Sequence, residues 1–286
     1  MTPPPPATGY RLVRLTNGSH SIHSFAHGET CHPAVGPVAE AESLYVQQLN
    51  LRERLRKHSG EFVIWDVGLG AAANVLTVLR AAREFSHPIR LVSFDCTLEP
   101  LQFGLRHADA MGYFDGYEKV LADLLKRHRA QFLNGSHPVD WALHLGDFPS
   151  ILVQTSPLPA PHAVLFDAYS PAKNPAMWTL PLFKNLFSRL DPRRACALPT
   201  YSRSSILRTT LLLAGFFVGV GKATGQKEET TLAANTLDLL TMPLDRRWLE
   251  RVKRSHSAEP LTEAVYQRLP LSEESWDKLQ RHPQFN

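Results

Sequence analysis

The chain has 286 residues, of which 43% are hydrophobic and 20% are charged, and its formal net charge is +4. This composition is that of a globular protein and excludes wholesale disorder, and the length suits one α/β domain with additions or two small domains. The longest apolar run, at 211–220, is too short to cross a bilayer, so we do not expect a membrane protein. Three scattered cysteines without CxxC spacing argue against a disulfide framework and a structural zinc site.

The composition and patterning of the first 60 residues predict a tail and a small N-terminal extension. Residues 1–9 are proline-rich, so we expect a flexible tail; they lack the basic and apolar segments of a signal peptide, and we expect a cytoplasmic protein. Alternating runs on either side of Asn17-Gly18 predict a hairpin over 10–25, because this dipeptide tolerates positive φ. Residues 38–57 predict a helix with a buried stripe. We expect residues 10–60 to pack on the following core.

Residues 61–242 predict the core, because short apolar runs alternate there with amphipathic stretches. Strands are expected at 62–67, 90–95, 142–147, 163–167 and 195–200, with a helix at 71–85 and further helices between the strands. This alternation is typical of a mostly parallel sheet with helices on both faces. Residues 215–220 and 235–241 are expected to pair as a closing hairpin, and residues 243–286 to form a helical tail.

Carboxylates stand at the ends of four predicted strands. They are Asp66, Asp95, Asp147 and Asp167. In open α/β sheets the carboxyl ends of the strands line the ligand crevice. One acid at such a place is common by chance, whereas four in register indicate a binding site.

A turn with two glycines, Gly68 and Gly70, links the first core strand to its helix. These glycines let the backbone turn sharply and approach a ligand, although Ala72 stands where a dinucleotide fingerprint has a third glycine. Asp95, at the end of the next strand, is placed to accept hydrogen bonds from ribose hydroxyls. The pattern suits a nucleoside-containing ligand and leaves NAD and S-adenosylmethionine open; a plain tight turn is the alternative.

Residues 167–178 form the most informative segment. An acid at a strand end, followed by a loop with two prolines and an aromatic residue, indicates a shaped acceptor pocket. Such a carboxylate can orient an amine and accept its proton during alkyl transfer. The structural alternative is that Pro171 and Pro175 end the strand and that Met177 and Trp178 belong to the core.

Three segments resemble the MnmC/MnmD tRNA methyltransferases. Residues 167–179, Asp-Ala-Tyr-Ser-Pro-Ala-Lys-Asn-Pro-Ala-Met-Trp-Thr, resemble the family's signature D-G-F-x-P-x-K-N-P-x-M-W-T. Residues 66–74 look like its E-x-G-x-G-T-G-x-N turn, and residues 38–42 resemble its G-L-A-E-A segment. The resemblance covers the chain from about residue 20 to about residue 235.

The resemblance implies a Rossmann-like methyltransferase with a seven-stranded sheet whose last strand is antiparallel. It implies S-adenosyl-L-methionine as cofactor and N-methylation of 5-aminomethyl-2-thiouridine at the tRNA wobble position. The implied cofactor-binding residues are Asp66, Gly68, Gly70, Asn74, Asp95 (ribose) and Asp147 (adenine). Asp167 is implied as the catalytic carboxylate. The implied substrate-binding residues are Tyr169, Lys173, Asn174 and Lys227.

The chain departs from the family pattern at two places. Ala72 adds a methyl group near the cofactor, and Gly225-Gln-Lys227-Glu228 replaces the family's G-x-K-R, which puts the substrate in question. The chain is also too short for the FAD-dependent oxidoreductase domain of the bifunctional members, so a separate enzyme is expected to supply the aminomethyl uridine. The alternatives are a Rossmann-fold methyl- or aminopropyltransferase for a small amine, and a non-catalytic RNA-binding relative.

Two other clusters have weaker functional readings. His20, His23, His27, Cys31 and His32 crowd one region but lack the spacing of metal ligands, so we expect a solvated hairpin or a flap over the cofactor and no metal. Residues 245–254 form a basic run with an aromatic residue. They predict either an amphipathic helix with a solvated face or a contact with phosphates.

Overall fold

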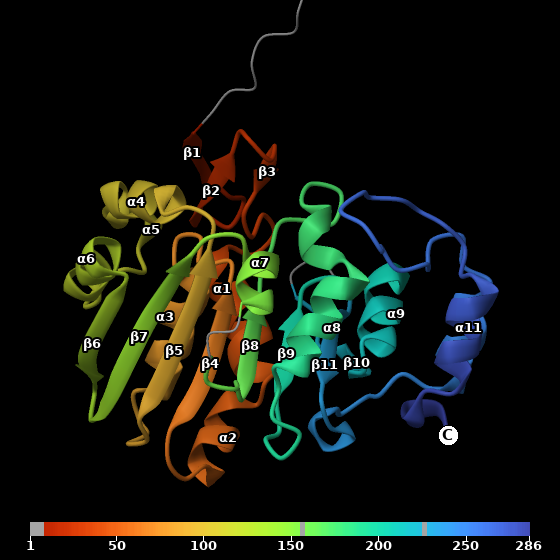
Figure 1. Cartoon of the computed structure of the whole chain (residues 1–286). Coiled ribbons are helices and arrows are strands. Elements are labelled where there is room, and N and C mark those ends of the chain that lie inside the picture. Colours follow the sequence, from red (N-terminus) through yellow and green to blue (C-terminus); the bar gives the residue numbers. More distant parts are fainter. Residues whose placement is uncertain (1–8, 155–157, 225–227) are drawn as a thin grey trace, which may run out of the picture. The chain divides into compact units, whose positions relative to one another are not determined.

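The computed structural model describes residues 9–154, 158–224 and 228–286 (Figure 1). Two compact units emerge: the first comprises Met1–Phe62 and Asp66–Gly146, and the second Val63–Trp65 and Asp147–Asn286. The core strands form one mixed sheet in the order β10-β11-β9-β8-β4-β5-β7-β6. This confirms the predicted α/β class, but the sheet has eight strands, not seven. The proline tail up to residue 8 lies outside the described residues.

The predicted N-terminal hairpin is confirmed. Strand β1 (Tyr10–Arg14) pairs antiparallel with β2 (His20–Ser24), and the short β3 (Glu29–Thr30) adds a third strand that the sequence did not predict. Gly18 in the connecting turn has the positive φ that the Asn-Gly signal allows, +85°, whereas Asn17 does not adopt a positive φ. The sheet contacts α4 (Glu99–Arg106), because the Tyr10 ring is 6.0 Å from that of Phe103.

The single helix predicted over residues 38–57 is instead three pieces. They are α1 (Pro37–Ala41), the π-helical η1 (Glu42–Gln47) and α2 (Leu51–Lys57). Asn50 breaks the helix with φ +48° and ψ +42°, a left-handed conformation that asparagine tolerates better than most residues. Leu44, Leu51 and Leu55 are buried as predicted, whereas Val38 is 41% exposed.

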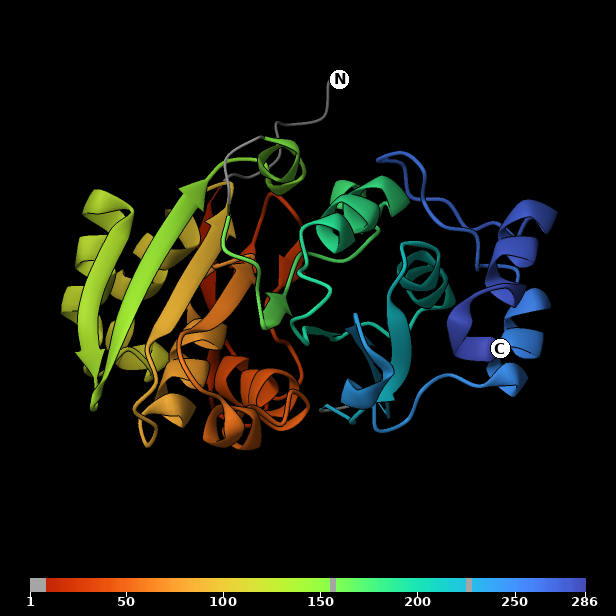
Figure 2. The same ribbon diagram turned by 60° about the horizontal axis from the view of Figure 1, so that its bottom comes forward.

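The first unit contains β5 (Ile89–Asp95), β6 (Arg129–Asn134), β7 (His137–Leu145) and both ends of β4 (Phe62–Val67), whose middle residues Val63–Trp65 belong to the second unit. Strands β5 and β7 are parallel, and β6 pairs antiparallel with β7 across Gly135 and Ser136 (Figure 2). Strand β6 is the unpredicted eighth strand, and β7 starts five residues before its predicted position. The helices of this part are α3 (Ala73–Ala82), α4 (Glu99–Arg106), α5 (Ala108–Met111) and α6 (Glu118–Arg127).

The second unit contains β8 (Ala163–Phe166), β9 (Ala197–Thr200), β10 (Phe217–Gly221) and β11 (Thr230–Ala234). Strand β9 is parallel to β8, and β11 is antiparallel to both β9 and β10. The closing hairpin therefore exists, but its second strand is not at 235–241. There the Asn235 side chain accepts the Cys196 N–H at 2.8 Å, and η3 (Leu237–Leu239) follows. The helices of this part are α7 (Phe148–Val153), η2 (Pro175–Trp178), α8 (Leu180–Ser188) and α9 (Ser205–Leu213).

The C-terminal tail is helical only in part. It contains α10 (Arg246–Lys253), α11 (Glu273–Gln280) and η4 (Pro283–Phe285), with an irregular segment at 254–272. Gln284 fixes the end of the chain to the edge strand β10, because its side chain accepts the Val218 N–H and donates to the Val218 carbonyl, both at 2.7 Å. The tail thus satisfies a strand edge that would otherwise be open.

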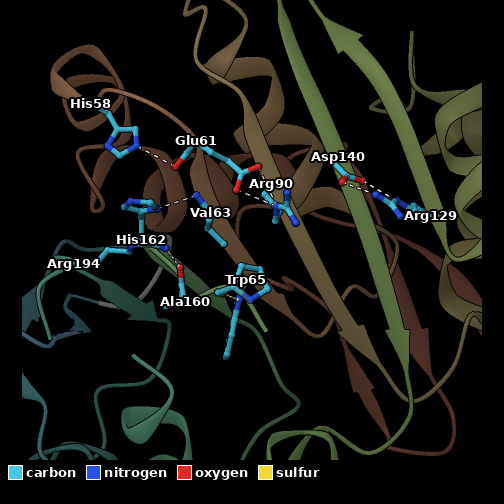
Figure 3. A network of polar contacts seen from close by, with 11 residues as sticks. His58, Glu61, Val63, Trp65, Arg90, Arg129, Asp140, Ala160, His162 and Arg194 are labelled. Atoms are coloured by element: carbon cyan, nitrogen blue, oxygen red, sulfur yellow. Dashed lines mark hydrogen bonds and ion pairs between the residues drawn. The ribbon is translucent and has the colours of Figure 1, made fainter. Parts of the chain in front are cut away.

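Polar contacts stabilise the amino ends of the strands (Figure 3). In the first unit, Arg90 at the start of β5 donates to both oxygens of Glu61 at 3.0 Å. In the second unit, the Val63 N–H donates to Nδ1 of the buried His162 at 2.9 Å, and Trp65 donates to the carbonyl of Pro159 at 2.9 Å. None of the predicted site residues takes part in these contacts; Asp66 and Asp95, for example, lie at the carboxyl ends of β4 and β5.

Candidate functional site

The turn after β4 adopts the left-handed backbone conformation that its glycines permit. Gly68 has φ +93° and Gly70 has φ +52°. The Gly68 N–H donates to the carbonyl of Phe94 at 2.9 Å, which ties the turn to β5. Apart from Gly70 itself and its two chain neighbours, no heavy atom of the described residues lies within 4 Å of the point where a side chain at Gly70 would begin. The turn therefore leaves open space beside Gly70 into which a ligand can approach the backbone.

Asp95 is joined directly to this turn. Its Oδ2 accepts the Gly70 N–H at 2.9 Å, and its Oδ1 accepts the Thr97 N–H at 3.1 Å. Burial raises the pKa of the Asp95 carboxyl above its ordinary value, although these N–H groups act in the opposite direction. The structure thus brings two predicted cofactor residues into contact, and it holds the carboxylate rigidly at the end of β5.

Tyr10 and Tyr113 surround the same region, and sequence reasoning missed both. The Tyr113 hydroxyl donates to the carbonyl of Ala71 at 3.2 Å. Burial, together with the negative charges of Glu99 and Asp95, raises the pKa of Tyr10 to about 12. Tyr10 comes from the hairpin, whose predicted role as a flap over the cofactor stays a prediction. No motif marks Tyr113, which lies far along the chain from the turn.

Ala72, at the position of the missing third glycine, is also left-handed, with φ +63°. This conformation costs a non-glycine residue roughly 1–2 kcal/mol. Its N–H donates to the Leu69 carbonyl at 2.7 Å, and the residue is fully buried. The backbone therefore keeps the conformation that a glycine would adopt, and the added methyl group lies inside the protein. Asn74, in the first turn of α3, is buried as well.

Asp66 lies beneath the turn. It is fully buried, and its Oδ2 accepts the hydroxyl of Ser93 at 2.7 Å. The Ser93 oxygen in turn accepts the indole N–H of Trp141 at 2.9 Å. This chain of hydrogen bonds fixes the carboxylate between β4, β5 and β7. Its predicted role at the methionine end of the cofactor stays a prediction.

The first unit therefore fits the adenosine-containing cofactor that the sequence predicts. A carboxylate held at the end of β5, open space beside Gly70 and a turn in the left-handed conformation are the features that a ribose and its neighbouring groups require. Gly68, Gly70 and Asp95 are the residues that would hold this group.

Asp147 belongs to the second unit and has a structural task there. It is exposed and is the N-cap of α7, because its Oδ2 accepts the Ser150 N–H at 3.1 Å and the Ser150 hydroxyl at 2.5 Å. A cap of this kind stabilises a helix by about 1 kcal/mol. The predicted position of Asp147 beside the adenine stays a prediction.

Asp167 stands at the carboxyl end of β8, in a loop fixed on both sides. The Tyr201 hydroxyl donates to the carbonyl of Ala168 at 3.0 Å, and the indole of Trp178 donates to the carbonyl of Tyr169 at 2.8 Å. Trp178 is 1% exposed, and its ring meets that of Tyr201 edge-on at 6.0 Å. Trp178 is thus a core residue, as the structural alternative predicted, and it also shapes the loop.

The remaining predicted substrate residues differ in exposure. Lys173 is exposed and Asn174 is half-buried, and the N–H groups of both donate to the Ser170 carbonyl at 2.8 Å. Lys227 lies outside the described residues. The neighbouring Glu228 pairs with Arg203 at 3.6 Å but is 91% exposed, which makes this a weak surface contact.

Tyr201 is the residue of this loop that sequence reasoning missed. It directly follows β9, so the rule that ligands meet the carboxyl ends of strands would have pointed to it.

The described residues contain no group of three or more His, Cys, Asp or Glu side chains able to hold a metal ion. In the hairpin, the His23 ring instead contacts the Thr30 hydroxyl at 2.9 Å. No helix in the described part of the chain is long and apolar enough to span a membrane.

Comparison with known proteins gives one family. Residues 114–236 match a family described as S-adenosyl-L-methionine-dependent methyltransferase. The bifunctional protein MnmC of tRNA 5-methylaminomethyl-2-thiouridine biosynthesis from Aeromonas hydrophila is 30% identical over 207 residues, covering 67% of this chain and 30% of that protein. Its counterpart from Burkholderia mallei is 28% identical over 225 residues, covering 74% and 32%. The chain thus spans about a third of the length of these relatives.

Solved structures agree on the fold. MnmC2 from Aquifex aeolicus superposes with a TM-score of 0.72 at 22% identity, covering 96% of this chain and 85% of that one. Spermidine synthase from Thermotoga maritima follows at 0.50 and 10% identity, covering 94% and 83%. Both likenesses concern the fold alone. The family match and the MnmC relatives confirm the resemblance seen in residues 167–179: the chain is an S-adenosyl-L-methionine-dependent methyltransferase that is similar to the methyltransferase part of MnmC.

Proposed function

We propose that this chain transfers a methyl group from S-adenosyl-L-methionine to the aminomethyl nitrogen of 5-aminomethyl-2-thiouridine at the wobble position of tRNA. The observation that carries the proposal is the loop of residues 167–178. Its sequence resembles the MnmC signature, and the bonds from Tyr201 and Trp178 hold its main chain beside Asp167. The MnmC relatives, whose names specify this modification, support the same acceptor.

For this methyl transfer the protein has two tasks: it must position the amine and provide a proton acceptor. When bound, S-adenosyl-L-methionine supplies a methyl group on a sulfonium, which is already activated for transfer. Asp167 orients the amine through a hydrogen bond and takes the proton that leaves the nitrogen as the new N–C bond forms and the C–S bond breaks. The carboxylate also offsets the positive charge that develops on nitrogen.

The other roles follow the resemblance. Tyr169, Lys173, Asn174 and Lys227 contact the acceptor nucleoside. Asp66, Asn74 and Asp147 join Gly68, Gly70 and Asp95 in holding the cofactor. The protein acts in the cytoplasm, where its tRNA substrate is found, and a separate enzyme supplies the aminomethyl uridine.

The test combines labelled S-adenosyl-L-methionine with tRNA from cells that lack the final methylation step, followed by mass spectrometry of the nucleosides. We expect label on 5-aminomethyl-2-thiouridine with the wild type, and a loss of at least 100-fold with Asp167→Asn. Asp277→Asn is the matched control, because this carboxylate is exposed on α11 in the same unit.

Two results would contradict the proposal in different ways. Cofactor binding by calorimetry without any labelled nucleoside would favour a small-amine acceptor. RNA binding without cofactor binding, unaffected by Asp167→Asn, would favour a non-catalytic relative.

A further inference from the structure

The second unit contains a small pocket beside the loop of residues 167–178, which we call the signature loop. It has a volume of about 120 Å³. Its walls come from three segments: the signature loop, the turn between β9 and α9, and the C-terminal segment. Its lining includes Pro171, Trp178, Ser202, Ser204, Leu207 and Tyr266. Asp167 does not line it, so the pocket is distinct from the proposed reacting carboxylate.

The C-terminal wall is a loop of residues 258–272, which we call the C-terminal loop. The N–H groups of Ala258 and Glu259 both donate to the Leu269 carbonyl, at 2.9 and 3.1 Å, which closes the loop at its base. The Glu259 carboxylate accepts the N–H of Ser272 at 2.8 Å and the hydroxyl of Ser275 at 2.9 Å, which ties the base to α11. The loop is therefore fixed at its base.

The same loop is attached to the end of the signature loop. The Leu180 N–H donates to the Leu261 carbonyl at 2.7 Å, and Thr179 forms a parallel bridge with Leu261. Leu261 is buried, whereas residues 262–265 and 267–269 are exposed. Tyr266 is the half-buried residue among these exposed ones. In Figure 1 the loop runs in blue between α8 and α11.

The lining suits a flat ring with polar edges. Tyr266 and Trp178 are aromatic, and Pro171 and Leu207 add apolar surface. Ser204 accepts the Leu207 N–H at 3.2 Å, and Ser202 accepts the Ser204 N–H at 3.4 Å. Because each hydroxyl oxygen is used as an acceptor, its O–H can donate to a ligand carbonyl. A pyrimidine base presents such carbonyls, and aromatic surface binds bases by stacking.

A cationic side chain, Arg268, contacts Tyr266 of the pocket lining. The Arg268 guanidinium lies 5.7 Å from the centre of the Tyr266 ring, and its Nε donates to the Tyr266 hydroxyl at 3.1 Å. This contact orients the phenol ring, and it leaves the other guanidinium N–H groups available to a phosphate oxygen. Aromatic and cationic groups side by side are what a nucleotide requires.

We propose that this pocket binds a pyrimidine base of the RNA substrate next to the acceptor nucleoside, stacked on Tyr266, with Arg268 contacting its phosphate. The inference rests on the proposed function, since it needs an RNA substrate. Tyr266 is then a positioning residue: it holds the strand so that the acceptor amine reaches the reacting groups, and it takes no part in the chemistry.

The test uses an anticodon stem-loop RNA that carries the fluorescent base pyrrolo-cytidine beside the wobble position. Binding is measured with the Asp167→Asn protein, so that no turnover intervenes. We expect the pyrrolo-cytidine fluorescence to be quenched on binding, because the base stacks. Tyr266→Ala should abolish the quenching and weaken RNA binding about 5- to 100-fold, whereas Tyr266→Phe should keep both. The neighbouring Val265→Ala, 52% exposed, is the control.

Methylation of tRNA separates this proposal from the proposed function. In the otherwise wild-type enzyme, Tyr266→Ala should raise KM for tRNA and leave calorimetric cofactor affinity unchanged. Arg268→Ala removes one phosphate contact, so the slope of log K for RNA binding against log salt should fall in magnitude by about one. If Tyr266→Ala left the quenching and the KM for tRNA unchanged while tRNA methylation stayed intact, the proposal that the pocket binds a base would be wrong and the proposed function would stand. Absence of tRNA methylation in the wild type would overturn the proposed function and this inference with it.

Discussion

Asp95 is a carboxyl group whose surroundings favour the protonated form, although its proposed task requires the ionised one. Burial raises its pKa, and the N–H groups of Gly70 and Thr97 offset this only in part. Ribose hydroxyls donate hydrogen bonds to a carboxylate, and such charge-assisted bonds contribute about 1.5–3 kcal/mol. The conflict between burial and function gives the residue a measurable pH signature.

We expect the affinity for S-adenosyl-L-methionine to increase as the pH rises through the raised pKa of Asp95 and then to level off. In the cofactor-free protein, the stability of the fold changes with pH in the opposite direction. The folded-state pKa exceeds the unfolded value, so the stability contributed by this group is lost as the pH rises through the folded pKa. Asp95→Asn should weaken cofactor binding by about 10- to 100-fold and remove the pH dependence, which calorimetric titrations at several pH values would measure. A pH-independent affinity in the wild type would contradict the assignment.

Tyr201 tests whether the loop that carries Asp167 must be rigid. Tyr201→Phe removes the hydroxyl that donates to the Ala168 carbonyl and keeps the ring that packs on Trp178. We expect a loss of about 1 kcal/mol in the free energy of unfolding and a lower kcat, with cofactor affinity unchanged. Denaturant unfolding and steady-state kinetics would measure these effects. A wild-type kcat would show that the loop keeps its shape without this bond.

At the scale of elements, a buried cation fastens α9 to β11. Arg208 is 2% exposed, and it donates to the Thr230 carbonyl at 2.8 Å, donates to the Thr231 hydroxyl at 3.1 Å and pairs with Glu229 at 3.1 Å. Removing a buried charge together with its bonds leaves its partners unsatisfied. This ties the C-terminal half of the sheet to its covering helix.

Arg208→Ala should lower the free energy of unfolding by about 3–5 kcal/mol, measured by denaturant titration. The matched control is Arg203→Ala, since Arg203 precedes the same helix and its pairing with Glu228 is exposed. That variant should stay within about 0.5 kcal/mol of the wild type. Equal losses in the two variants would show that burial does not decide the strength of these pairs.

Local signals predicted elements well where the chemistry was local. The Asn17-Gly18 hairpin formed as expected, and Asn134-Gly135 carries the same signal for the unpredicted hairpin of β6 and β7. The closing hairpin was misplaced for another reason. Residues 235–241 have strand composition, but Asn235 is engaged with the Cys196 backbone, so the strand ends at Ala234. Composition cannot reveal such a tertiary contact.

The candidate site also contains residues that the sequence predicts and residues that only the fold reveals. Its acids and glycines were predictable, because the ends of strands are marked by apolar runs that stop at a turn. The residues that hold them, Tyr201 and Tyr113, come from distant segments and bond to main-chain carbonyls. A main-chain acceptor has no sequence signature, so only the fold reveals these partners.

At the scale of the whole molecule, the net charge of +4 is consistent with a polyanionic substrate and is concentrated in part on α10. Trp248, Leu249 and Val252 of this helix are buried. Its exposed side chains include Arg246, Arg247, Arg251 and Lys253, with Glu250 as the single acid. Lys253 lies 4.5 Å from the centre of the Trp276 ring, which engages it within the protein. The arginines are therefore the groups that remain to meet phosphates.

Under the proposed function, α10 contributes to tRNA affinity through phosphate contacts, whose strength falls steeply with salt. The double variant Arg246→Gln/Arg247→Gln should weaken tRNA binding for every sequence alike, and the slope of log K against log salt should fall in magnitude by about two. Lys278→Gln is the control, because that lysine pairs with Glu274 on the exposed face of α11. Fluorescence anisotropy between about 50 and 200 mM salt covers the range in which the contacts are lost. An unchanged slope would mean that the charges of α10 are solvated in the complex, and that the polyanion is held by other parts of the chain.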